Sequence, residues 1–242
     1  MSDTSIPTYR SLANDIQMSF DADGSPHRGS RFPISQIVAK LLTSRSSVYR
    51  RSKEARQGIS EQCIQTIPCI PLEKADKEIC PCAPPSGCIW LRSKDPIPKA
   101  IFLNTVSNSS ANFTAQFVDW TQFDLKISGR SFKKGDKYYT FLDSGNGSYL
   151  YLYNTKKLKN IAITGVFEDP VDAITFEGCE TMTKKQKEIM CSPFDAPLYM
   201  DGRITDIVCA LVTDFFAKKL QLGQPDLVNN DREDRSGINT TV

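Results

Sequence analysis

The sequence is poor in the residues on which many enzymes depend. It has a single histidine, His27, among 242 residues. A Ser-His or Cys-His catalytic pair is therefore not favoured, because only this one residue can supply its histidine. No glycine-rich loop of the kind that cradles phosphates is present. No hydrophobic run approaches the roughly 20 residues that a membrane-spanning helix needs. The formal net charge of +2 is close to neutral, so charge alone does not indicate nucleic-acid binding.

The clearest pattern in the chain is a strand followed by an amphipathic helix near the C-terminus. The apolar run 161–167 is typical of a buried strand, and Glu168-Asp169-Pro170 ends it. The later helix has apolar residues at i, i+3, i+4 and i+7, which predicts one continuous stripe. Gly223 and Pro225 are expected to end this helix. The stripe consists of Ile204, Ile207, Val208, Leu211, Val212 and Phe215.

The N-terminal part predicts two more helices. Leu12, Ile16 and Phe20 recur every four residues and favour a helix between residues 5 and 20. The second helix is expected at about 33–57, with Gly58 as its stop. Its second half is strongly basic, which fits either a solvated face or a surface that meets DNA or an acidic neighbour. The basic residues are Arg45, Arg50, Arg51, Lys53 and Arg56.

The middle of the chain reads as β-structure. Residues 64–75 are extended, because two prolines keep them out of a helix. Further strands are expected at 100–106, 113–117 and 124–128, and the clearest hairpin pairs 137–142 with 148–153. Leu150 and Leu152 are expected in the core. The opposite face of this strand carries Tyr149, Tyr151 and Tyr153. These tyrosines either form a surface for a partner protein or pack across the strands with Tyr139.

Together these patterns predict an α+β chain with a helical core from both termini and an inserted antiparallel β region. We expect a helical part at 1–60, followed by a Cys/Pro turn and the β insertion at 61–160. Residues 161–223 then supply a strand and the C-terminal helix, which complete the helical core, and 224–242 form a polar tail.

The eight cysteines are expected to be mainly free thiols, since Met1–Ser5 does not begin a secretory signal and the cytosol is reducing. Cys209 is interpreted as a small core residue. Cys80, Cys82 and Cys88 are the candidates for a zinc site, but a single residue separates the first two and the other gaps are uneven. Buried or turn thiols are therefore the preferred interpretation, and no metal or cofactor is expected.

A carboxylate cluster follows the C-terminal strand. Glu168, Asp169 and Asp172 suggest a metal-dependent acid site, but their spacing fits no established template. Asp and Pro are also the residues that begin helices for purely local reasons. Carboxylates of a loop and a helix start are thus the favoured interpretation, and we expect no enzymatic activity.

Several short segments resemble structural proteins of tailed phages that infect Bacteroidetes, in particular the crAss-like phages. The segments are 88–98, Gly165–Pro170, Cys191–Asp195, the terminal helix and Pro225–Asp231. The resemblance implies a head–tail connector, an adaptor or ring protein beneath the portal, in rings of many copies, typically twelve. It also implies a place in the neck or tail of the virion, after assembly in the host cytoplasm, and contact with the portal and the next tail or ring protein. Non-specific contact with packaged DNA is compatible with this role; a membrane is not involved.

The resemblance also directs attention to two sets of residues. The polar tail is expected to reach the portal or the next ring through Pro225, Asp226, Leu227, Asn229, Asn230 and Asp231. The basic half of the second helix is expected to face DNA or a neighbouring subunit through Arg45, Arg50, Arg51 and Arg56. The alternative is a zinc-containing nucleic-acid-binding module, which predicts bound metal and a salt-dependent affinity for DNA.

Overall fold

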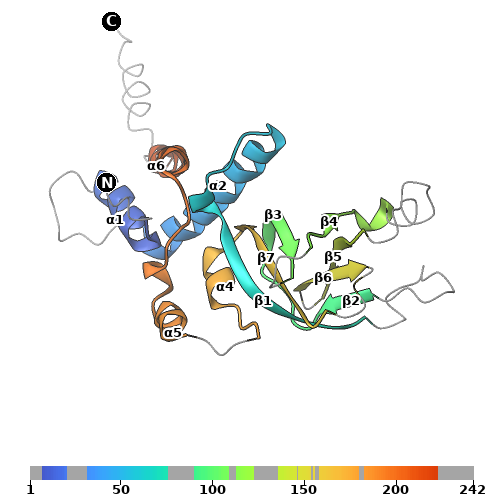
Figure 1. Ribbon diagram of the computed structural model, residues 1–242. Helices are drawn as coiled ribbons and strands as arrows, with labels where there is room; N and C mark the ends of the chain where they lie inside the picture. The colour runs from blue at the N-terminus through green and yellow to red at the C-terminus, as the bar shows by residue number, and fades with distance from the viewer. Residues whose placement is uncertain are drawn as a thin grey trace, which may run out of the picture.

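Helices from both ends of the chain pack together beside a β-sheet in the computed structural model (Figure 1). The structure describes residues 7–20, 32–75, 90–108, 113–122, 136–145, 147–153, 155, 158–179 and 183–222. Its helices are α1 (Tyr9–Phe20), α2 (Ile34–Glu54), α4 (Pro170–Thr175), α5 (Lys184–Cys191) and α6 (Gly202–Leu222). Short 3-10 turns are η1 (Glu61–Cys63), η3 (Trp120–Gln122) and η4 (Pro193–Asp195).

The helical core is built from α1, α2 and α6, as the sequence predicts. Pro33 occupies the position before α2, where its missing N–H and fixed φ are tolerated. Asp201 begins α6, because its carboxylate accepts a 2.9 Å hydrogen bond from the Ile204 amide. The apolar faces of the three helices meet in one cluster of buried side chains, which includes Leu12, Ile16, Ile37, Leu41, Val208 and Val212.

The buried row of α6 is narrower than the predicted apolar stripe. The fully or nearly fully buried positions repeat every four residues, at Ile204, Val208, Val212 and Phe216. Ile207 and Leu211, which belong to the predicted apolar stripe, are instead 42% and 39% exposed. The reason is geometric: α6 buries mainly one i, i+4 row against the helical cluster, and of the next row only Phe215 packs there.

The described strands form one seven-stranded sheet with the order β3-β7-β1-β2-β6-β5-β4. The pairs are antiparallel apart from β4–β5, which is parallel. The strands are β1 (Gln65–Lys74), β2 (Trp90–Ser93), β3 (Ala100–Ser107), β4 (Gln116–Phe117), β5 (Tyr138–Ser144), β6 (Gly147–Tyr153) and β7 (Asn160–Phe167). An α+β fold with an antiparallel sheet between terminal helices is confirmed.

Strand β7 links the helical core to the sheet. It lies between β3 and β1; one of its faces is buried along the strand, and the other is buried at its C-terminal end. Ile161, Ile163 and Phe167 belong to the core on one face of the sheet. Val166 points the other way and packs with the helices. Burial on both faces at residues 165–167 explains why the apolar residues are continuous at the end of this strand.

The β5–β6 hairpin is confirmed, with pairing from Tyr138 opposite Tyr153 to Ser144 opposite Gly147. Leu150 and Leu152 are fully buried, as expected. Tyr139 lies on the leucine face, so it is not the partner of the tyrosine face. Tyr151 instead belongs to a small hydrophobic cluster with Trp90, Val118 and Tyr138, and Tyr149 and Tyr153 pack against it. The strand expected at 124–128 lies outside the described residues.

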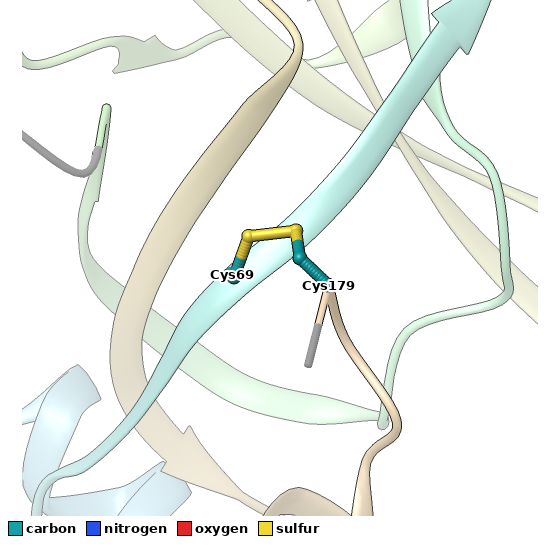
Figure 2. Close-up of a disulfide and its surroundings, with 2 residues drawn as sticks. All are labelled: Cys69 and Cys179. Carbon is teal, nitrogen blue, oxygen red and sulfur yellow. A yellow bond between two sulfur atoms is a disulfide. The ribbon is translucent and has the colours of Figure 1, made fainter. Parts of the chain in front are cut away.

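A disulfide joins Cys69 of β1 to Cys179, 110 positions later, with the two Cα atoms 5.4 Å apart (Figure 2). The expectation of mainly free thiols missed this pair; Cys63, Cys191 and Cys209 are free. The crossing is close, because a Cβ on Gly178 would lie 1.9 Å from the main-chain oxygen of Cys69. Glycine is therefore the residue that lets the chain after α4 approach β1.

Candidate functional site

The four arginines singled out on α2 and just after it occupy two different environments. Arg50, Arg51 and Arg56 are exposed, as a surface that meets DNA or a subunit requires. Arg45 is fully buried and does not reach the surface. The sequence contains a signal for this difference. Ile37, Leu41, Arg45 and Tyr49 recur every four residues, which places Arg45 on the apolar stripe of the helix.

Arg45 is held at the junction of the helical core and the sheet. Its Nη1 donates a 2.7 Å hydrogen bond to the main-chain oxygen of Phe167, and its guanidinium lies 4.9 Å from the Tyr49 ring centre. Burial lowers the pKa of this guanidinium below its ordinary value. Its Nε and Nη2 have no hydrogen-bond partner in the described part of the chain.

Neighbouring polar contacts fasten the same junction. Tyr9 on α1 donates its hydroxyl to Asp169 at 2.9 Å, and Tyr49 on α2 donates to the main-chain oxygen of Tyr199 at 2.9 Å. Burial, followed by the charge of Asp169, raises the pKa of Tyr9 above its ordinary value. These bonds tie α1, α2, the turn after β7 and the segment before α6 into one unit.

A groove of about 830 Å³ runs between α2 and the turn from β7 to α4. Arg50 forms an ion pair with Glu168 across it, and Lys99 approaches the same carboxylate at 3.5 Å. Three cationic residues and four acidic ones line the groove: Arg50, Arg51 and Lys99 against Glu54, Glu168, Asp169 and Asp172. Since phosphate binding needs an excess of positive charge, a polypeptide of mixed charge fits this groove better than DNA does.

Arg56 has an unusual backbone conformation at the end of α2. Its φ is 53°, in the left-handed region. The Arg56 amide donates to Lys53 O at 3.0 Å and the Gln57 amide to Ser52 O at 2.9 Å, which together form a Schellman motif. Glycine is the usual residue at this position of a Schellman motif, because it adopts a positive φ without strain. The chain has an exposed arginine there instead, and its backbone is more strained than that of a glycine.

The carboxylate cluster has structural roles. Glu168 pairs with Arg50, while Asp169 begins α4 by accepting a 2.9 Å hydrogen bond from the Val171 amide and also accepts the Tyr9 hydroxyl. Asp172 lies in the first turn of α4; burial, and then the Asp169 charge, raise its pKa. Within the described ranges, no group of three or more His, Cys, Asp or Glu residues is placed to hold a metal ion.

Other predicted residues fall in parts of the chain that the structure does not describe. These include His27, the zinc candidates Cys80, Cys82 and Cys88, and the tail residues Pro225, Asp226, Leu227, Asn229, Asn230 and Asp231. Among the helices that are described, none is both long and apolar enough to cross a membrane.

Comparison with known proteins finds a matching family. The family model described as phage tail ring protein 2, of crAss-like phages, matches residues 27–235. The matched region includes α2, the whole described sheet and α6. No curated protein matches the chain.

Proposed function

Because this chain belongs to the phage tail ring protein 2 family of crAss-like phages, we propose that it joins the portal to the tail. Membership makes it a structural component of the tail, and hence of the virion, and not an enzyme. A ring protein is a homo-oligomer. The finer proposal is a ring of about twelve copies that surrounds the DNA channel, with each copy in the same relation to the next. The observation that carries it is the family match over residues 27–235.

The exposed arginines contribute a surface that faces a neighbouring subunit. Arg50 is already paired with Glu168, and the groove around it carries both signs of charge. A neighbouring polypeptide with its own mixed charges satisfies such a surface, whereas phosphates meet four carboxylates there. Arg51 lines the same groove, and Arg56 is exposed just beyond the end of α2. Arg45 has no part in this surface because it is buried.

The tail after α6 makes the contact with the portal or the next ring. Helix α6 runs to Leu222, and residues 225–231 follow after Gly223 and Gln224 in the sequence. This segment combines one apolar anchor, Leu227, with side chains that donate and accept hydrogen bonds: Asp226, Asn229, Asn230 and Asp231. A short peptide of this composition suits attachment to a larger protein partner.

A mass measurement of the chain mixed with its portal tests the proposal. The full chain should form a large complex, and a chain that ends at Gly223 should not. A chain that ends at Asp231 is the matched control, since it keeps the proposed contact and should still bind. Equal binding by all three would refute the role of the tail, and no complex with the full chain would refute the connector function.

The arginine surface is tested separately in assembled particles. Arg50→Ala with Arg51→Ala should reduce ring assembly while DNA retention in completed particles stays normal. Arg92→Ala is the matched control, because Arg92 also pairs with a carboxylate, that of Glu73, and does not line the groove. If the double variant assembles as well as the control, the basic face is only solvated. If assembly is normal and DNA retention fails, the surface faces DNA instead.

A further inference from the structure

The described part of the chain exposes six large hydrophobic side chains, and four of them form two pairs. Ile207 and Leu211 lie one turn apart on α6, and Met190 and Phe194 lie four positions apart across α5 and η4. The other two, Met18 and Phe117, lie singly on α1 and β4. A ring of identical copies needs two different faces on each copy, one for each neighbour. Exposed apolar residues that lie in pairs are candidates for such faces, because grouped apolar side chains mark protein–protein contacts.

The first pair, which we term the α6 face, lies beside the buried stripe of that helix. Because Ile204, Val208, Val212 and Phe216 turn toward α1 and α2, Ile207 and Leu211 point away from the helical core. Arg203 and Asp206 are also exposed here, and neither forms an ion pair in the described chain. The α6 face therefore offers two apolar side chains with one positive and one negative charge close by.

The second pair, which we term the α5 face, is fixed in place before any partner arrives. The Thr183 capping box begins α5, and Gln186 Nε2 donates a 2.7 Å hydrogen bond to the main-chain oxygen of Ile174. The η4 turn is held by Asp195, which pairs with Arg10 at 2.6 Å. A rigid surface loses little conformational entropy on binding, which favours a stable contact.

The charges around the α5 face complement those of the α6 face. Exposed Lys187 and Glu188 accompany Met190 and Phe194. Among the described residues, the one ion-pair partner of Glu188 is Lys184, at 3.9 Å. Lys187 can meet Asp206 of another copy, and Glu188 can meet Arg203. Each face thus presents two apolar groups and an opposite pair of charges, the combination expected of surfaces that bind each other.

The position of the two faces suits a head-to-tail contact. In Figure 1, α6 and α5 lie on opposite sides of α1 and the start of α2, so a single copy cannot bring the faces together. We propose that the α6 face of one copy packs against the α5 face of the next copy around the ring. This contact rests on the ring assembly of the proposed function but requires no portal and no tail segment.

A cross-linking experiment in phage particles tests the contact. Cys191 is exposed and free beside Met190, so it supplies a native thiol on the α5 face. Particles that carry Leu211→Cys, treated with a short bifunctional maleimide, should yield covalent dimers and longer ladders of this chain. Adding Cys191→Ser should remove them. Met18→Cys, at an exposed position on α1, is the matched control and should give no ladder.

The outcomes separate this contact from the ring itself. A ladder that persists with Cys191→Ser, or its absence in Leu211→Cys particles that hold a normal number of copies in a ring, overturns the α6–α5 contact. Particles in which the unmodified chain forms no ring would instead overturn the proposed function. Neither variant removes a buried side chain, so both are expected to fold normally.

Discussion

Arg45 Nη1 donates a 2.7 Å hydrogen bond to the main-chain oxygen of Phe167, and this contact joins α2 to the end of β7 inside the protein. No carboxylate of the described residues forms an ion pair with Arg45. A buried cation is costly when its donors lack partners, and two nitrogen atoms of Arg45, Nε and Nη2, have none in the described part of the chain. The arginine nevertheless fills space where the helical core meets the sheet.

Two substitutions at Arg45 separate volume from charge. Arg45→Met keeps most of the volume and removes the unpaired donors, so the free energy of unfolding should stay within about 1 kcal/mol of the wild-type value. Arg45→Ala leaves a cavity and should lose about 2–4 kcal/mol. Both variants give up the bond to Phe167, so that bond cancels in the comparison. Urea unfolding measures the free energy of unfolding of both variants. A methionine variant as unstable as the alanine variant would show that the volume of the side chain is not what stabilises the junction.

The Cys69–Cys179 disulfide should stabilise the chain by closing a long loop. Because its cysteines are 110 positions apart, opening it should lower the free energy of unfolding by about 2–5 kcal/mol. Cys69→Ser and Cys179→Ser should each lower the free energy of unfolding by a similar amount. Because neither variant can form this bond, a reductant should not lower their stability further by breaking it. Cys191→Ser is the control, since Cys191 is exposed and free. Urea unfolding of the wild type with and without reductant should differ; coincident curves would show that the bond contributes nothing.

The sequence predicts the elements well because their signals are local. The four-residue recurrence in α1 and α2, and the alternation in the β5–β6 hairpin, come from one helix face or one strand face meeting the core. Periodicity does not say how wide the covered stripe is. Helix α6 therefore showed an apolar row, Ile207 and Leu211, that its neighbours inside the chain leave exposed.

Contacts between distant segments were beyond sequence reasoning. Cys69 meets Cys179 only because β1 and the chain after α4 come together in the fold. Arg45 is the same residue type as its exposed neighbours on α2, so residue type does not set it apart. Only its i, i+4 spacing from Leu41 and Tyr49 indicates that it is buried. The mixed charge of the groove also required structure, because Glu168 and Arg50 are 118 positions apart.

Tyr139 should make the protein sensitive to alkaline pH. Burial raises its pKa to about 12, from the 10.0 of an exposed tyrosine. The stability linked to Tyr139 is therefore fully present below pH 10 and is lost as pH rises toward 12, because the unfolded chain releases this proton first. Stability measurements between pH 8 and 11.5 should show a downward slope that is smaller in Tyr139→Phe. Identical slopes would mean that this phenol does not carry the effect.

Arg56 offers a way to separate strain from charge at the end of α2. Because its φ of 53° is unfavourable for a residue with a side chain, Arg56→Gly should raise the free energy of unfolding by about 0.5 kcal/mol. Arg56→Ala removes the same charge and keeps the strain, so its stability should stay within about 0.5 kcal/mol of the wild type. If the arginine is retained for a contact between subunits, both variants should impair ring assembly equally despite their different stabilities. Thermal unfolding and the yield of assembled particles measure the two effects. Normal assembly of both variants would show that Arg56 is not part of the contact between subunits. A glycine variant that is less stable than the wild type would show that the backbone at this position is not strained.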